Sequence, residues 1–349
     1  MAQTGLYYDG VKLLSLKDCD GLTPAVYVSE TNRSGGKTTY FSRYLINRFL
    51  KHNEQFILLY RMENELKDVH VKFFEDELQE LFFPDHEMTS SYHKGDGFCT
   101  LMLDGVECGF GVALSAANKI KKISKHFIHV ETIFFDEMQL EDMDYDKDEI
   151  THFLSIYKSV ARGGGKAARY VRVIMACNPV SILNPYYTEL GVTTKINQNG
   201  DFCKGPGWVV ETSVCLNAQE QQQRSAISRA FGNSDYIKFS DDGVHMINDS
   251  AFIAKPSGRN NYLLTLRYNG KDYSIRQYFD AGVIFVSDNV DATFPIKIAC
   301  TKDDHTINYV MDNCSKTFIP HFREMFARGV FRFADINSKN ALLTFIAMR

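Results

Sequence analysis

The sequence lacks the cysteine patterns that stabilise small secreted domains or hold zinc. It has eight cysteines, but they include no Cys-x-x-Cys pair and no cluster with histidine at metal-ligand spacing. A disulfide framework and a zinc site are therefore not expected, and a reducing cytoplasm is the natural setting.

Long hydrophobic runs are also missing. No segment approaches the roughly 18 apolar residues of a membrane-spanning helix, and the first residues lack the charged-then-apolar order of a signal peptide. We therefore expect no membrane partner. The chain has 349 residues, 44% hydrophobic and 23% charged, which is enough for one large or two medium globular domains.

An overall excess of positive charge is absent, since the formal net charge is −4. The charge is unevenly spread, because residues 252–349 contain 13 Lys and Arg against 9 Asp and Glu, which leaves the rest of the chain acidic. An acidic body with a mildly basic C-terminal part suits a protein that contacts nucleic acid locally.

What the sequence does contain is a candidate phosphate-binding loop at residues 30–38, Glu-Thr-Asn-Arg-Ser-Gly-Gly-Lys-Thr. It follows an apolar run at residues 25–28 and precedes a helix predicted over residues 38–50, which is the context of such loops. Loop amides would donate to phosphate oxygens, Lys37 would reach the terminal phosphates, and the Thr38 hydroxyl would ligate Mg²⁺. The predicted cofactors are therefore ATP and Mg²⁺, and the predicted nucleotide-binding residues are Arg33, Ser34, Gly35, Gly36, Lys37, Thr38 and Thr39.

The loop departs from the G-x-x-x-x-G-K-[ST] pattern at Thr31, where the pattern has glycine. Because threonine tolerates a positive φ poorly, the sequence does not predict the backbone conformation at Thr31. A bare Gly-Lys-Thr also occurs as a surface turn before an unrelated helix, and a second motif is needed to decide.

That second motif is an apolar strand predicted at residues 130–135, which ends at Asp136 and Glu137. In an open α/β sheet the carboxyl ends of the strands face the ligand crevice. Asp136 would hold Mg²⁺ and Glu137 would polarise the attacking water. A further strand, predicted at residues 172–177, ends at Asn178, which would sense the γ-phosphate. The alternatives are solvated acids and an asparagine that caps a strand end.

With these motifs in place, the chain resembles the double-stranded DNA packaging ATPases of small tailed phages, the phi29-like group. The similarity extends over roughly residues 5–190 and is weaker beyond. It includes Asn47-Arg48-Phe49-Leu50-Lys51, Glu54-Gln55-Phe56-Ile57, Phe83-Pro84-Asp85-His86-Glu87, Phe134-Phe135-Asp136-Glu137 and Asn178-Pro179-Val180-Ser181-Ile182-Leu183-Asn184-Pro185-Tyr186.

The resemblance implies a homo-oligomeric ring motor, a pentamer, that binds double-stranded DNA on a phage prohead. It also implies a prohead portal and a prohead structural RNA as partners, with the protein in the host cytoplasm, transiently on the prohead and not in the mature virion. By the same resemblance, Arg162 is the arginine finger given to a neighbouring subunit, with Arg169 and Arg172 as competitors. Arg61 matches an arginine of the nucleotide-proximal lid.

The predicted fold is α/β in three parts. Residues 1–200 form a P-loop ATPase domain of the ASCE type with a mostly parallel sheet, and residues 98–114 form a hairpin inserted between core elements. Residues 191–213 read as an irregular connector, and a linker subdomain at residues 201–250 carries an exposed helix at 217–231. Residues 251–349 form an α+β domain that binds nucleic acid. Its strands run from residue 262 to 286 with a turn at Asn269-Gly270, its helical segments lie at 307–312 and 318–328, and by the resemblance it has a degenerate RNase H-like fold with a vestigial nuclease site.

Four lysines lie close together just before the acidic strand, at Lys119, Lys121, Lys122 and Lys125. Point charges on flexible stems suit sequence-independent contact with phosphates, so these lysines are predicted to form a DNA-binding loop. The alternative is a solvated surface, which is common for lysine runs.

Asp272, Asp280, Asp288 and Asp291 fall at predicted turns and strand ends. They do not form the converging carboxylates of a two-metal nuclease, and no cleavage is predicted. The leading function is an Mg-dependent ATPase that translocates double-stranded DNA into a prohead. A helicase, a terminase with an active nuclease, and a non-catalytic capsid-associated scaffold that binds nucleic acid remain as alternatives.

Overall fold

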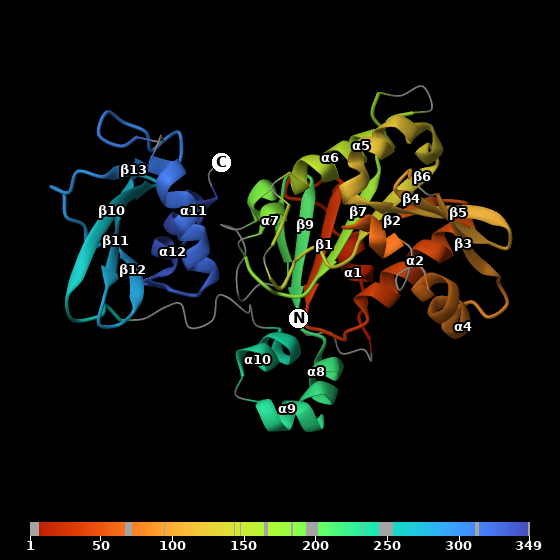
Figure 1. Ribbon diagram of the computed structural model, residues 1–349, viewed down its shortest axis with the longest axis horizontal. Coiled ribbons are helices and arrows are strands. Elements are labelled where there is room, and N and C mark those ends of the chain that lie inside the picture. The colour runs from red at the N-terminus through yellow and green to blue at the C-terminus, as the bar shows by residue number, and fades with distance from the viewer. Residues whose placement is uncertain are drawn as a thin grey trace. The chain divides into compact units, whose positions relative to one another are not determined.

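The computed structural model describes residues 7–66, 72–93, 95–142, 144–146, 148–163, 167–182, 184–192, 202–232, 234–243, 254–310 and 314–347. The chain forms two compact units, each of which contains its own sheet (Figure 1). The first unit consists of Met1–Pro179 and Asn197–Val244, and the second of Val180–Ile196 and His245–Arg349.

The first unit is built on a nine-stranded sheet in the order β3-β4-β5-β2-β6-β7-β1-β9-β8. The central strands β5, β2, β6, β7, β1 and β9 run parallel, and antiparallel strands complete both edges. The predicted mixed α/β fold with a large, mostly parallel sheet is therefore confirmed. The strands are β1 (Val26–Thr31), β2 (Gln55–Tyr60), β3 (Met88–His93), β4 (Phe98–Leu103), β5 (Val106–Ala113), β6 (Val130–Phe135), β7 (Arg172–Cys177), β8 (Phe202–Gly205) and β9 (Trp208–Ser213).

β2 and β7 are almost continuously apolar after their first residue, as expected of parallel strands that are covered on both faces. β6 and β7 are buried along nearly their whole length, and Phe134 of β6 pairs with Ile174 of β7. Since parallel strands in register end at the same edge, the residues that follow β6, β7 and β1 come together there.

Helix α2 (Lys37–His52) follows β1 and lies against the sheet. Its buried stripe of Phe41, Leu45, Ile46 and Phe49 has the i, i+4, i+8 spacing of an amphipathic helix, and Asn53 ends it in the left-handed conformation. The other helical segments of this unit are α1 (Val11–Ser15), η1 (Glu63–Leu66), η2 (Phe73–Leu78), α4 (Gln79–Phe82), η3 (Leu114–Ala116), α5 (Ala117–Ile120), η4 (Lys121–Phe127), α6 (Glu149–Val160), α8 (Leu216–Gln223), α9 (Ala226–Phe231) and α10 (Asp235–Asp242).

Two predictions about this unit need correction. The hairpin of β4 and β5 is present, but it is not an insertion, because β5 pairs in parallel with β2 and continues the main sheet. The irregular connector predicted at residues 191–213 is wrong for residues 202–213, which form β8 and β9. β9 pairs with β1 from Val26 to Thr31, so it borders the strand that leads into the candidate loop.

The second unit contains a five-stranded sheet in the order β13-β10-β11-β12-β14, with α7 (Pro185–Leu190), α11 (Cys314–Ala327) and α12 (Ile336–Ile346). β10 (Asn260–Tyr268), β11 (Lys271–Tyr278) and β12 (Val283–Ser287) are antiparallel, while β13 (Lys297–Ala299) and β14 (Phe331–Phe333) add parallel strands at the two edges.

The predicted turn at Asn269-Gly270 is confirmed, with φ values of 50° and 74°, and so are the third strand and the helix at 318–328. The predicted helix at 307–312 is wrong where residues are described, because Tyr309 and Val310 make isolated β-bridges. β13, β14 and α12 have no counterpart in the sequence prediction.

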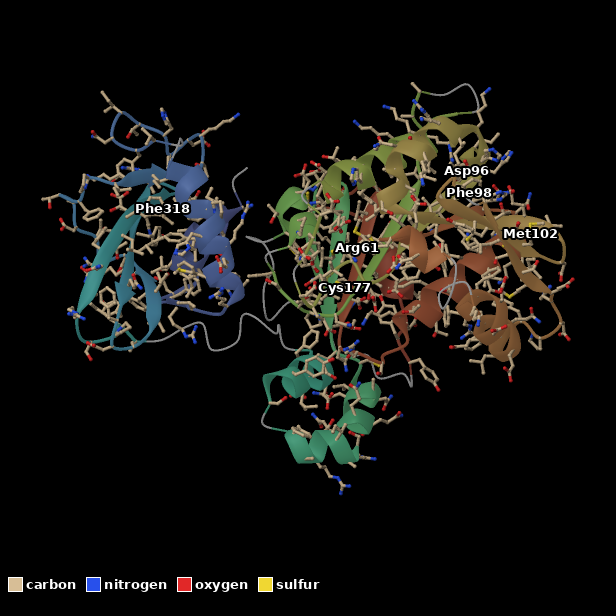
Figure 2. The ribbon with its side chains drawn as sticks, viewed as in Figure 1. Arg61, Asp96, Phe98, Met102, Cys177 and Phe318 are labelled. Atoms are coloured by element: carbon tan, nitrogen blue, oxygen red, sulfur yellow. The ribbon has the colours of Figure 1, made fainter. Side chains whose placement is uncertain are left out.

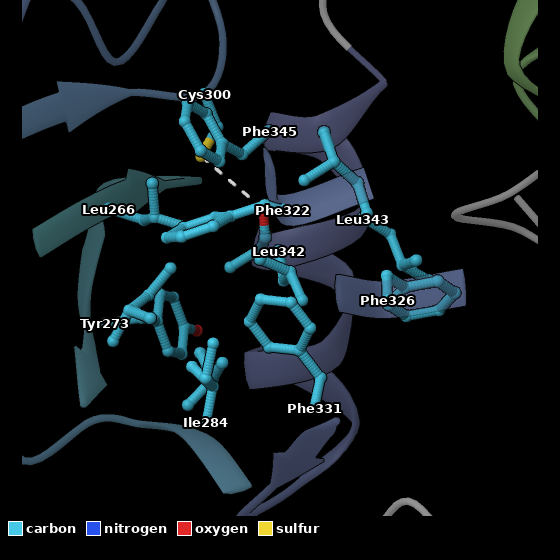
Figure 3. Close-up of a cluster of buried hydrophobic side chains, with 14 of the residues drawn as sticks. Leu266, Tyr273, Ile284, Cys300, Phe322, Phe326, Phe331, Leu342, Leu343 and Phe345 are labelled. Atoms are coloured by element: carbon cyan, nitrogen blue, oxygen red, sulfur yellow. Dashed lines mark hydrogen bonds between the residues drawn. The ribbon is translucent and has the colours of Figure 1, made fainter. Parts of the chain in front are cut away.

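The core of the second unit is an aromatic and aliphatic cluster between the sheet and its helices (Figure 3). Phe322 of α11 is 1% exposed, and its ring contacts the rings of Phe331 and Phe345 at centroid distances of 5.4 and 6.1 Å. The Cys300 Sγ donates to the Ala341 carbonyl at 3.6 Å, the dashed line in Figure 3.

Phe322→Ala is expected to lower the free energy of unfolding by about 3–5 kcal/mol, because it removes a buried ring and leaves a cavity. Urea unfolding followed by circular dichroism measures this loss. Phe279→Ala is the matched control, since that ring is 42% exposed. Equal effects of the two substitutions would contradict the assignment of Phe322 to the core.

Among the described residues, no helix combines the length and the apolar character that crossing a membrane requires.

Candidate nucleotide site

The loop at residues 32–36 leaves β1 and enters α2 with two residues in the left-handed region. Ser34 has φ 59° and Gly36 has φ 86°. Backbone amides around such residues form concavities that bind anions, and the N-terminus of a helix adds its dipole. The predicted positions Arg33 to Thr39 run through this loop and the first turn of α2, and their contact with phosphate stays a prediction.

Thr31, which breaks the sequence pattern, causes no strain. It is the last residue of β1, and its φ is not positive. The non-glycine residue of the loop that adopts a positive φ is Ser34. The Thr31 hydroxyl accepts a hydrogen bond from Lys37 Nζ at 2.9 Å. Threonine thus supplies an acceptor that glycine would lack.

Lys37 lies beneath the loop and is 8% exposed. Besides the Thr31 hydroxyl, its Nζ donates to the carbonyls of Thr31 and Asn32, both at 3.0 Å, and to Asn178 Oδ1 at 3.2 Å. Burial lowers the pKa of the Lys37 ammonium to about 8, although the nearby Cys177, Asp136 and Glu30 favour the charged form.

Nucleotide affinity is therefore expected to fall as the pH rises through about 8. The charged ammonium binds phosphate, and above that pKa the free protein must first take up a proton. Linkage with a free-protein pKa of about 8 gives roughly tenfold weaker binding at pH 9 than at pH 7. Titration with a fluorescent ATP analogue measures the affinity, and Lys37→Gln should bind weakly with no such dependence. A wild-type affinity that stays flat across this range would contradict the Lys37 assignment.

Thr38 and Asp136 meet at the same edge of the sheet. The Thr38 Oγ1 donates to Asp136 Oδ2 at 2.6 Å, although the two residues are 98 positions apart. A hydroxyl and a carboxylate at this separation suit the coordination sphere of Mg²⁺, whose preferred ligands are hard oxygens. The donor set fits a magnesium ion that also contacts a nucleotide phosphate. No group of three or more His, Cys, Asp or Glu that could hold a metal by itself occurs among the described residues.

Glu137 directly follows Asp136 and is exposed, with a φ of 52°. Its amide donates to Asp136 Oδ1 at 3.0 Å. Asn178 follows β7 and reaches the same place, since its side chain accepts from Lys37. The structure therefore brings together Lys37, Thr38, Asp136 and Asn178 directly, and it places Glu137 next to them in the chain.

Arg61 directly follows Tyr60, the last residue of β2. Figure 2 labels Arg61 together with Cys177, the last residue of β7. Its guanidinium donates to Glu149 and to the carbonyls of Glu137 and Met138. A direct contact of Arg61 with nucleotide stays a prediction.

Several residues that contact the loop were not predicted from the sequence. The Tyr8 amide donates to the Gly35 carbonyl at 2.8 Å, and Gln222 Nε2 of α8 donates to the Ser34 hydroxyl at 3.1 Å. The Arg33 amide donates to the Ser240 carbonyl of α10 at 3.1 Å. Helices α8 and α10 therefore contact the loop, whereas the sequence indicates only an exposed helix in this region. Arg33 also pairs with Glu141 at 2.9 Å.

The three candidate finger arginines differ in their surroundings. Arg169 donates to the Phe127 and Val160 carbonyls at 2.9 and 3.0 Å, and burial lowers the pKa of its guanidinium. Arg172 bonds the Tyr44 hydroxyl. Arg162 is exposed, and its Nη2 donates a long hydrogen bond of 3.5 Å to the Ser124 hydroxyl. Of the three, Arg162 is the exposed one, and its role as the finger stays a prediction.

The lysine run forms helical turns in α5 and η4 rather than the predicted loop. Lys119 pairs with Glu63 at 2.7 Å, so its charge is largely compensated within the chain. Lys121, Lys122 and Lys125 are exposed on the η4 surface. Their contact with DNA stays a prediction.

In the second unit, three of the four aspartates considered for a nuclease accept hydrogen bonds within the chain. Asp272 accepts from the Tyr309 hydroxyl at 2.6 Å, and Asp291 accepts from the Thr293 hydroxyl at 2.7 Å. Asp280 accepts from the Arg259 amide at 3.3 Å.

The first unit has an open, mostly parallel sheet, and the carboxyl edge of this sheet carries a glycine-containing loop, a buried lysine and an acidic strand end. This combination is typical of nucleotide-binding α/β proteins. A model of the podovirus DNA encapsidation protein (Gp16) family matches residues 2–348, and the chain belongs to this family. The resemblance to phi29-like packaging proteins is thereby confirmed.

Individual relatives agree with this membership. The DNA packaging protein of Bacillus phage phi29 is 28% identical over 306 residues, covering 86% of this chain and 87% of that protein. The DNA packaging protein of Bacillus phage B103 is 27% identical over 307 residues, covering 86% and 90%.

Two solved structures share the fold over nearly the whole chain. A chain of the bacteriophage Phi-29 viral genome packaging motor assembly superposes with a TM-score of 0.54 at 24% identity, covering 99% of this chain and 100% of that one. The Phi-28 gp11 DNA packaging motor gives a TM-score of 0.58 at 15% identity, covering 98% and 97%.

Proposed function

We propose that this protein is an Mg-dependent ATPase that translocates double-stranded DNA into a phage prohead, acting as a homo-oligomeric ring. The observation that carries the proposal is the hydrogen bond of 2.6 Å between Thr38 and Asp136, next to the buried Lys37. These residues would hold the phosphates and Mg²⁺ of a nucleotide together. Because the chain belongs to a family of DNA encapsidation proteins, DNA is the proposed substrate of translocation.

Each residue has a distinct part in the proposed hydrolysis. The loop amides from Arg33 to Gly36 bind phosphate oxygens, and Lys37 leaves its loop carbonyls to reach the terminal phosphates. Bound Mg²⁺ would neutralise charge that develops on the phosphates, held by Thr38 and Asp136.

The remaining roles concern the water and the γ-phosphate. Glu137 accepts a proton from the attacking water, and Asn178, freed by the movement of Lys37, contacts the γ-phosphate. Arg162 stabilises the transition state in the site of the neighbouring subunit.

We propose a pentameric ring on a prohead portal, in contact with a prohead structural RNA, in the host cytoplasm and absent from the mature virion. We also propose an ATPase domain at residues 1–200, a linker at 201–250, and a C-terminal domain at 251–349 that is RNase H-like, binds nucleic acid and does not cleave it. The hydrogen-bonded aspartates of this last domain support the absence of cleavage.

Steady-state ATP hydrolysis tests the proposal, measured with protein alone, with blunt double-stranded DNA and with single-stranded DNA of equal length. Stimulation by duplex alone is the expected result. Equal stimulation by single strands would favour a helicase, and cutting of linear DNA in Mn²⁺ would favour a terminase with an active nuclease. Failure of the protein to bind ATP would favour a non-catalytic scaffold.

A further inference from the structure

A cleft lies among helices α8, α9 and α10, the three helices that follow β9 in the first unit (Figure 1). Its volume is about 560 Å³, which is within the range of sites for small molecules. Ile227, Phe231 and Tyr236 line it, and these side chains are 60%, 60% and 47% exposed. Large apolar side chains that stay exposed around a concave surface are typical of a place where a ligand binds.

Two residues that line this cleft also contact the candidate phosphate-binding loop. Gln222 Nε2 donates to the Ser34 hydroxyl at 3.1 Å, and the Ser240 carbonyl accepts from the Arg33 amide at 3.1 Å. The cleft is therefore adjacent to the site proposed for the phosphates. A ligand that occupies both places has phosphates joined to a flat, largely apolar group. A nucleotide is such a ligand, because its sugar connects the phosphates to an aromatic base.

The cleft also contains a hydrogen-bond acceptor that is not used within the chain. Gln222 Oε1 is buried, and none of the described residues donates to it. Burial of a polar atom without a partner is unfavourable, so a ligand that supplies the partner binds more tightly. The buried carboxylate of Asp241 already accepts from the hydroxyls of Ser228 and Ser240, both at 2.7 Å. The ligand group that faces Gln222 is therefore a donor.

We propose that this cleft binds the adenine ring of the nucleotide whose phosphates the loop holds, and that Gln222 selects adenine by accepting a hydrogen bond from its amino group. The inference rests on the proposed nucleotide site. Adenine carries an amino donor at the ring position where guanine and hypoxanthine carry a carbonyl acceptor. With either of those bases, two acceptors would face each other at Gln222. Phe231 supplies a ring against which the base packs.

Isothermal titration calorimetry of the protein in Mg²⁺ tests the inference with ATP, inosine triphosphate and inorganic tripolyphosphate. Inosine triphosphate has a carbonyl in place of the amino group, and tripolyphosphate has no base. Wild-type protein should bind ATP about 10- to 100-fold more tightly than inosine triphosphate, because the latter leaves the buried acceptor unpaired. Gln222→Leu should bind ATP about tenfold more weakly, with the two nucleotides then within about threefold of each other.

Gln223→Leu is the matched control, because Gln223 lies in the same helix, is exposed, and donates to Asp242 at 2.8 Å. It should leave all three affinities unchanged. Phe231→Ala is a second variant, since an exposed ring can be removed without damage to the core. It should weaken the binding of ATP and inosine triphosphate equally, by about tenfold, because both bases lose the same packing surface. Binding of tripolyphosphate to Phe231→Ala should not change.

The tripolyphosphate measurement separates the base site from the phosphate site. If Gln222→Leu weakens all three ligands equally, Gln222 only supports the loop through Ser34, and the inference is overturned. Equal binding of ATP and inosine triphosphate by wild-type protein would overturn it as well. The proposed phosphate site would still stand in that case if Lys37→Gln weakens the binding of tripolyphosphate. Absence of binding by all three ligands would overturn the nucleotide site itself, and the inference with it.

Discussion

Glu137→Gln is expected to lower the rate of ATP hydrolysis by about 10²- to 10⁴-fold, the usual contribution of a general base. The substitution removes the carboxylate that accepts a proton from water. It keeps the length of the side chain and the same backbone restraints, so the left-handed turn should persist. Lys37, Thr38 and Asp136 are untouched, so Mg·ATP should still bind.

Two measurements on the same protein sample check this expectation. Steady-state hydrolysis gives the loss of turnover, and titration with a fluorescent ATP analogue gives the affinity. Glu80→Gln is the control, because it removes one negative charge from the exposed surface of α4 in the same unit. Near-normal hydrolysis by Glu137→Gln would exclude Glu137 as the base, and a parallel loss of binding would indicate a structural defect.

The parts of the site that the sequence predicts are those encoded within a single segment. The loop and α2 follow from local chemistry, and β6 and β7 follow from continuous apolar runs that end in polar residues. The parallel pairing of these strands with their neighbours then brings Asp136 and Asn178 to Lys37 without further information. One loop and two strand ends were enough to predict the candidate site.

The parts that the sequence does not predict depend on contacts between distant segments. Arg61 and Glu149 are 88 residues apart, and no local pattern marks a partly buried arginine that bonds backbone carbonyls. β9 has a short apolar stretch next to Gly207, so it resembles a connector until its pairing with β1 is known. Lys119 reads as a free cation in the sequence, yet Glu63, 56 positions away, neutralises it.

Solvent exposure also distinguishes between the three candidates for the arginine finger. The spacing of these arginines in the sequence does not decide between them. Arg169 and Arg172 have partners inside their own chain, with Arg169 bonded to main-chain carbonyls and Arg172 to a tyrosine. An arginine that acts on another subunit has to be accessible from outside. Exposure therefore favours Arg162. The strongest test uses two kinds of subunit, one that keeps Arg162 and one that keeps a nucleotide site able to receive it.

Arg162→Ala and Lys37→Ala are each expected to abolish nearly all hydrolysis alone, by about 10³- to 10⁵-fold for a true finger. Mixed in equal amounts, they should recover activity. A subunit that keeps Lys37 can then receive Arg162 from a neighbour that lacks Lys37. In a ring of head-to-tail interfaces with random mixing, about a quarter of the sites regain both residues.

Mixing Lys37→Ala with Glu137→Gln provides the matched control. Both residues belong to the same chain and the same site, so no arrangement of these subunits creates a complete site. Native mass spectrometry must show mixed assemblies in both experiments. Recovery with Arg162→Ala and none with Glu137→Gln would show that Arg162 acts across the subunit interface. No recovery at any ratio, with mixed rings present, would assign Arg162 to its own chain and leave the finger to be sought elsewhere.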